Sequence, residues 1–258
     1  MNSVRPDPWS DFRGLTAARI ALGRTGGSLP TAELLDFGLA HARARDAVNA
    51  PFDAQKLLAE LQAAGYPSML LQSVVNNRAD YLRRPDWGRR LNETSRQQLT
   101  AIASNGPFDL CIIISDGLSS RAIKHVLSVL VPLHELLVAE GWRIAPVLVV
   151  PFGRVAIQDE IGELLGATLS LMLLGERPGL GSPDSLGAYF VHRPQAGNMD
   201  AHRNCVSNIR PAGLPPATAV TTLHYLLHAA RTRGISGVAL KDERLLNVSG
   251  AAKALDNL

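Results

Sequence analysis

Three continuous apolar runs in the middle of the chain constrain its fold more than any other feature. They span residues 109–115, 145–150 and 168–174, and two amphipathic helical stretches separate them. A run that is apolar at every position is typical of a strand buried on both faces of a parallel sheet. The order strand, helix, strand, helix, strand predicts a βαβαβ unit with right-handed crossovers. We therefore expect an α/β fold with a Rossmann-like, mostly parallel sheet flanked by helices.

The segments around this unit are less regular. Residues 1–27 contain Pro6, Pro8 and a glycine-rich stretch, which indicates an irregular arm with one turn of helix at most. We predict helices over 31–48 with Thr31 as N-cap, over 53–64 with Asp53 as N-cap, over 92–103, and over 218–233 ending at Gly234. We also predict a short strand at 68–74, a strand at 184–193 and a loop at 204–211. The last 15 or so residues are predicted to form a helical tail. The chain divides into an N-terminal arm and helical region, 1–103, and an α/β domain, 104–258.

The predicted topology places three loops together. Parallel strands end on one edge of their sheet, where open α/β folds bind ligands. The loops that follow the three buried runs are 116–119, 152–155 and 175–178. A ligand site is therefore expected at this edge. Asp116 either contacts the ligand or closes a turn and caps the next helix through its carboxylate, and the second role is favoured.

Charge is scarce, and arginine dominates it. Charged residues make up 19% of the 258 residues, against about 25% in typical domains. Such depletion is typical of a surface buried against another subunit, although an alanine-rich globule has the same composition. Of the 26 basic residues 22 are Arg, which suits interfaces and anionic ligands but also follows from codon preference. The arginines are scattered, so we expect no nucleic-acid partner; the richest stretch, 83–90, is interpreted as protein-contacting or solvated.

Two cysteines and a polar N-terminus indicate the compartment. Cys111 lies in a buried run and is a core residue, whereas Cys205 lies among hydrogen-bonding side chains where a small thiol can line a ligand surface. Two cysteines in different contexts fit a reducing cytoplasm. We find no export signal and no apolar stretch of about 18 residues, so no membrane partner is expected.

Several familiar site patterns fail. The loop after the first buried run has one glycine where dinucleotide binding needs three, and neither a P-loop nor G-x-S-x-G occurs. His224 and His228 lie four residues apart on a predicted helix and could share a metal, but no third ligand is apparent in the sequence. We interpret the pair as structural and expect no metal ligands; His41, His125 and His134 are interpreted likewise.

Six segments together resemble a known family. They are 18–24, 115–119, 175–180, 182–187, 203–211 and 236–242, none of which is a widespread motif. In sequence, order and spacing they are similar to the small (light) subunit of adenosylcobalamin-dependent ethanolamine ammonia-lyase, over nearly the whole chain. This resemblance implies a lyase that converts ethanolamine to acetaldehyde and ammonia by a radical mechanism.

The resemblance also implies how the work is divided. The large (heavy) subunit is expected to hold ethanolamine, and the corrinoid to lie between the two subunits with its own base on cobalt. Family contacts to the corrinoid fall on Val155, Glu176 and Cys205, with no catalytic residue on this chain. Val155 would offer apolar contact, Glu176 would accept hydrogen bonds from corrin amides, and Cys205 would pack against the ring edge or tail. Consistently, Asp200-x-His202-x-x-Cys205 has cysteine where the cobalt-ligating motif has glycine, so His202 is not expected to bind cobalt.

Two other functions remain open from the residues. One is an autonomous α/β small-molecule enzyme that uses Asp116 and Glu176 at the sheet edge, and the other is a purely structural clamp for a partner. We expect a cytoplasmic protein, with the bacterial microcompartment of some family members as the alternative. The chain reaches the family's Asp7-Pro8-Trp9 region almost at once, which disfavours encapsulation through a tail of this subunit.

Overall fold

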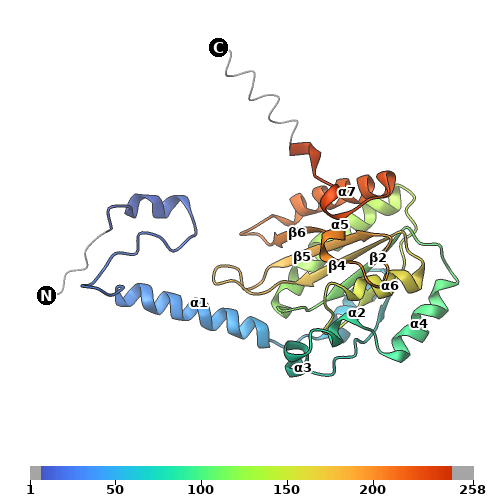
Figure 1. Cartoon of the computed structure of the whole chain (residues 1–258), viewed down its shortest axis with the longest axis horizontal. Helices are drawn as coiled ribbons and strands as arrows, with labels where there is room; N and C mark the ends of the chain where they lie inside the picture. Colours follow the sequence, from blue (N-terminus) through green and yellow to red (C-terminus); the bar gives the residue numbers. More distant parts are fainter. Residues whose placement is uncertain (1–6, 246–258) are drawn as a thin grey trace, which may run out of the picture.

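The computed structural model describes residues 7–245 and contains one six-stranded mixed sheet (Figure 1). The strand order is β1-β3-β2-β4-β5-β6. The first four strands in this order are parallel, and β5 and β6 extend the sheet as antiparallel strands. This confirms the α/β, Rossmann-like prediction. The strands are β1 (Ser68–Leu70), β2 (Leu110–Ser115), β3 (Val147–Val149), β4 (Leu169–Gly175), β5 (Leu186–His192) and β6 (Asn204–Ile209).

Helices cover the two faces of the sheet and form two cores. One face packs against α2 (Ala54–Ala63), α5 (Val126–Ala139) and α7 (Pro216–Arg233). The other packs against α4 (Glu93–Ala103) and α6 (Ile157–Leu165). Along β2, Ile112 belongs to the first core and Ile113 to the second, so successive side chains alternate between the faces, as the continuous apolar run requires. The remaining elements are α1 (Thr31–Asn49), α3 (Arg78–Arg83) and the short 3-10 helices η1 (Ser10–Leu15), η2 (Trp87–Arg89), η3 (Ser120–His125), η4 (Asp200–His202), η5 (Gly237–Ala239) and η6 (Glu243–Leu245).

Helix α1 projects away from the sheet and carries the N-terminal arm at its far end (Figure 1). It begins directly after Pro30, so the prediction of Thr31 as N-cap was wrong by one residue, since Thr31 is already helical. Its large apolar side chains stay exposed, with Leu34 at 57%, Leu35 at 68% and Leu39 at 49%, whereas the smaller Ala40 and Ala47 are buried. The Asp53 cap is confirmed, because its carboxylate accepts the Lys56 backbone N–H at 2.9 Å.

Some predicted elements differ in type or extent. Residues 204–211 were predicted as a loop but form β6, which pairs with β5 and places Val206 and Ile209 in the core. Polar residues at the other positions of β6 hid this pattern in the sequence. The strand predicted at 68–74 is only the three residues of β1, and α3 was missed. Most of the predicted helical tail lies outside the described residues.

The segment Ser120–Ala139 is a long apolar stretch of helix. By length and composition it could cross a membrane, with a mean hydropathy of 1.5. In the fold it is η3 followed by α5, and its inner side chains, including Leu130 and Leu133, are buried against the sheet. Its apolar character is therefore that of a core helix. The change from 3-10 to α geometry falls at 125–126, and Pro132 lies inside α5.

The three loops at the sheet edge do converge. The Leu118 N–H donates to the Gly175 carbonyl at 2.9 Å. A Cβ on Gly175 would lie 2.1 Å from the Ser119 carbonyl oxygen, so only glycine permits this approach. The Phe152 N–H donates to Asp116 at 2.7 Å. Asp116 closes the predicted turn, since its carbonyl accepts the Ser119 N–H at 3.1 Å, but the prediction that its carboxylate caps the next helix was wrong. The carboxylate instead ties the second loop to the first.

The predicted boundary between 103 and 104 stays a prediction. Strand β1, from the first segment, pairs with β3 from the second. Helix α2 likewise packs into the core formed with β2 and β4. Both segments therefore contribute to the sheet that positions the site.

Candidate functional site

A pocket of about 670 Å³ opens on the face of the sheet that carries α6. It lies beside the start of α6 and over β5 and β6, where Cys205 and Ser207 remain exposed. The antiparallel strands thus extend the sheet past the helix that covers its parallel part. The lining residues are Pro85, Arg89, Arg154, Val155, Ala156, Tyr189, Asn198, Met199, Asp200, Arg203 and Cys205.

Two of the three predicted contact residues line this pocket, and the third lies next to it. Val155 enters from the loop before α6, and Cys205 from β6, where it is paired in register with Tyr189 of β5. Glu176 does not line the pocket itself. Its carboxylate accepts from the Tyr189 hydroxyl at 3.4 Å, so one tyrosine links Glu176 to the pocket wall. The three residues, separated by up to 50 positions, therefore share one face of the sheet.

The Glu176 carboxylate is held by several donors. The Ser185 hydroxyl donates to it at 2.7 Å and the Asn208 backbone N–H at 3.4 Å. Gly187 permits this position, because a Cβ there would lie 2.5 Å from Glu176 Oε1. Each carboxylate oxygen can accept more than one hydrogen bond. Glu176 is therefore a fixed acceptor with capacity left for a ligand.

The environment of the Cys205 thiol favours its protonated form. Although the residue is exposed overall, desolvation within the pocket raises the pKa of Cys205 to about 11. Desolvation also raises the pKa of Tyr189, and nearby Cys205 and Glu176 add to that effect. Both groups are protonated at neutral pH, and only a thiolate is nucleophilic. This part of the pocket therefore offers neutral, weakly polar contact.

A buried ion pair supports the far side of the pocket. Arg203 is 8% exposed, and its guanidinium contacts the Asp159 carboxylate of α6 directly. It also donates to Asp200 at 2.8 Å and to the Asn198 carbonyl at 3.1 Å. Arg203 Nε has no hydrogen-bond partner among the described residues. The pair fixes the segment 198–203, which closes one side of the pocket.

The arginine-rich stretch forms the opposite rim. Pro85 and Arg89 line the pocket together with Arg154, which comes from the loop before α6. The Arg154 guanidinium stacks on Tyr81 with its central carbon 4.0 Å from the ring centroid, and it donates to the Tyr81 carbonyl at 2.8 Å. Arg84 instead pairs with Asp86 and stacks on Trp87 at the surface. The stretch is thus partly a pocket rim and partly solvated.

Sequence reasoning missed Tyr189, Arg154, Asp159 and Arg203 as site residues. A period-two reading of the strand at 184–193 could have placed Tyr189 on the face opposite Phe190. No sequence signal joins Asp159 to Arg203, which lie 44 positions apart.

Asp116 lies outside the pocket. It is 1% exposed, and its carboxylate bonds Phe152 and pairs with Arg78 at 3.2 Å. Burial raises the pKa of Asp116, an effect that the Phe152 N–H and Arg78 oppose. With its oxygens engaged inside the fold, Asp116 serves the loop structure. Asp116 is therefore not among the side chains that line the described pocket.

Comparison with known proteins identifies the family. The model of "Ethanolamine ammonia-lyase light chain (EutC)" matches residues 6–241. A protein of Pseudomonas syringae pv. tomato, named ethanolamine ammonia-lyase small subunit, is 51% identical over 99% of this chain and 90% of its own length. Proteins of the same name from Pseudomonas fluorescens Pf-5 and Pseudomonas aeruginosa are 52% and 53% identical, each over 92% of this chain and 88% of its own length. This chain therefore belongs to the ethanolamine ammonia-lyase light-chain family.

Proposed function

We propose that this chain is the small subunit of a cytoplasmic, adenosylcobalamin-dependent ethanolamine ammonia-lyase, and that its pocket forms one wall of the corrinoid site. The observation that carries the proposal is the placement of Val155 and Cys205 in one pocket, with Glu176 beside it. The family relatives are named as small subunits, which supports a large-subunit partner. The substrate site and the catalytic groups are assigned to that partner.

The chemistry of the pocket fits a corrinoid. The rim of a corrin ring carries amide side chains, which need both acceptors and donors. Glu176 supplies a fixed carboxylate, and Arg89 and Asn198 supply donors around an apolar wall that includes Val155. Because the pocket is open, with about 670 Å³ of volume, it would cover only part of so large a ligand. The large subunit would cover the remainder.

The roles of this chain are then binding, orientation and exclusion of water. Bound adenosylcobalamin would supply the radical chemistry, as cofactors do in such enzymes. Glu176 would fix the rotation of the ring through its amides, and Val155 and Cys205 would exclude water from the ring edge. Arg203 and Asp159 would hold the segment 198–203 against the ligand.

Replacing Glu176 tests its part in this proposal. Glu176→Ala removes an acceptor held by Ser185 and Asn208, and we expect the assembled enzyme to bind adenosylcobalamin about tenfold more weakly, because one hydrogen bond contributes about 1 kcal/mol or more. Glu176→Gln keeps one acceptor oxygen and should lose less. Equilibrium titration of the purified complex measures both affinities. Unchanged affinity in Glu176→Ala would remove the assigned role.

The exposed apolar side chains of α1 and the arm are proposed to contact the large subunit. Leu34 and Leu35 stand 57% and 68% exposed on a helix that projects from the body (Figure 1). The arm adds Trp9, Phe12 and Leu15, which are 63%, 47% and 80% exposed. So many large apolar side chains exposed within two consecutive segments are typical of a subunit interface.

Charges introduced on α1 should therefore prevent assembly. The double variant Leu34→Lys, Leu35→Lys is expected to bind the large subunit at least about 100-fold more weakly, because each leucine loses about 1.5–3 kcal/mol of burial. Co-purification and gel filtration measure the complex. Leu136→Lys, at a 44% exposed leucine of α5, is the matched control and should assemble normally. Normal assembly of the α1 variant would place the interface elsewhere.

A further inference from the structure

A cluster of ionisable side chains lies on the other face of the sheet from the pocket, between α5 and α7. His224 and His228 stand one turn apart on α7, and Glu140 is the residue that ends α5. Glu140 lies 84 positions before His224, so no spacing pattern marks it as a third member of the cluster. The packing of α5 against α7 brings it to the histidine pair.

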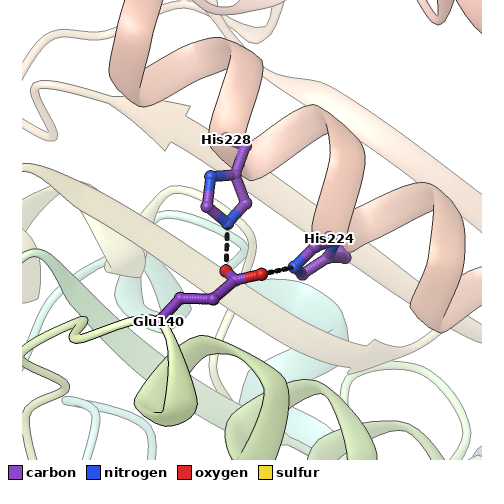
Figure 2. Close-up of side chains that lie close together, drawn as sticks. All are labelled: Glu140, His224 and His228. Carbon is purple, nitrogen blue, oxygen red and sulfur yellow. Dashed lines mark hydrogen bonds and ion pairs between the residues drawn. The ribbon is translucent and has the colours of Figure 1, made fainter.

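The three side chains converge on one point. His224 Nε2 lies 2.9 Å from Glu140 Oε1, and His228 Nε2 lies 2.5 Å from Glu140 Oε2. Figure 2 shows each imidazole directing a nitrogen to its own carboxylate oxygen. All three ligand atoms lie within 4.8 Å of one another. The side chains are 29%, 38% and 40% exposed in the order His224, His228 and Glu140, so a hydrated ion can reach them.

We propose that Glu140, His224 and His228 form a binding site for a divalent transition-metal cation, with Zn²⁺ as the best-suited ion. Two imidazoles and one carboxylate are a known zinc ligand set, in which water takes the fourth position. Imidazole nitrogens favour Zn²⁺, Ni²⁺ and Cu²⁺ over Mg²⁺ and Ca²⁺. Zinc–ligand distances of about 2.0–2.1 Å in a tetrahedron place neighbouring ligand atoms about 3.3 Å apart. The contacts of 2.9 and 2.5 Å would therefore have to widen by about 0.4 and 0.8 Å, a movement open to partly exposed side chains.

The surroundings restrain one ligand and leave little opposing charge. The edge of Trp142 packs against His228, with 5.1 Å between ring centroids, and restrains that ring. The nearby cation Arg231, stacked on Trp142, is paired with Asp109 at 2.8 Å, which offsets its charge. Arg231 therefore opposes a bound cation less than an unpaired arginine would.

Zinc titration of the cobalamin-free complex of this chain with its large subunit tests the site. Calorimetry should show one more Zn²⁺ per small subunit in the unsubstituted complex than in His228→Gln. Loss of a supporting residue next to a ligand already costs about 10–100-fold in affinity, so loss of the ligand itself should weaken this site by about 100-fold or more. His224→Gln should have the same effect, because it also removes one of the two imidazole ligands. Both histidine side chains are partly exposed, so the fold should tolerate either change.

The control is His41→Gln on α1, whose ring contacts Phe37 outside the cluster and whose loss should leave zinc binding unchanged. Co²⁺ added to the same complex should give the intense visible absorption of a tetrahedral site, and this signal should vanish in both cluster variants. Equal zinc stoichiometry and affinity in the unsubstituted protein and both cluster variants would overturn the proposal and leave the cluster as a metal-free link between α5 and α7.

Discussion

Replacing Arg203 by leucine is expected to lower the free energy of unfolding by about 3–5 kcal/mol, the usual cost of leaving one partner of a buried ion pair without the other. The Asp159 carboxylate would keep only the Asn198 side-chain amide, at 3.4 Å. The variant would also lose the hydrogen bonds of the Arg203 guanidinium to Asp200 and to the Asn198 carbonyl, together with its contact to Asp159 of α6. Urea unfolding of the purified small subunit measures the loss.

Two further variants separate the ion pair from other causes. The double variant Asp159→Leu, Arg203→Leu should recover most of the lost stability, because a buried pair replaced by apolar side chains is often neutral. Arg84→Leu removes an ion pair that is half exposed, with 50% and 47% exposure for Arg84 and Asp86, and should change stability little. A single Arg203→Leu variant as stable as Arg84→Leu would contradict the structural role of the pair.

Replacing Cys205 by tryptophan is expected to weaken adenosylcobalamin binding by about 100-fold while the subunits still assemble. The side chain projects from β6 into the pocket beside Tyr189 and not into the core, so the indole can be added without repacking the fold. It would occupy the volume assigned to the corrin edge, and overpacking of about 1–3 kcal/mol corresponds to a loss of up to about 100-fold. Titration of the assembled enzyme gives the affinity.

The matched control is Gln98→Trp, which adds the same side chain on the exposed surface of α4. It should leave both assembly and cofactor affinity unchanged. If Cys205→Trp bound adenosylcobalamin as tightly as Gln98→Trp, the pocket would not be part of the corrinoid site.

The parallel core was predictable because its signal is local. The runs at β2, β3 and β4 are almost continuously apolar, and every one of their residues is buried, as in strands covered on both faces. The convergence of the following loops then follows from strand direction. Strand β6 was missed because its exposed face carries Cys205 and Ser207, which read as loop residues. Those two exposed positions leave the pocket open.

The residues of the candidate site could not be predicted from their spacing in the sequence. Val155, Glu176 and Cys205 were assigned from a family resemblance, and no periodicity links them. The link is tertiary: the pairing of β5 with β6 sets Tyr189 beside Cys205, and Tyr189 reaches Glu176. The same limit applies to Glu140 and the histidines of α7, which only helix packing brings together. The exposure of Leu34 and Leu35 on α1 was likewise not predictable, because apolar residues on one face of a helix do not show which part of the protein packs against that face.

The most direct measurement of the central claim compares adenosylcobalamin binding by the large subunit alone with binding by the assembled complex. If this chain forms one wall of the corrinoid site, the large subunit alone should bind the cofactor far more weakly, and addition of the small subunit should restore tight binding together with ethanolamine-dependent ammonia release. Full affinity in the large subunit alone would reduce this chain to a structural clamp, and ammonia release by this chain alone would make it an autonomous enzyme; either result would contradict the account.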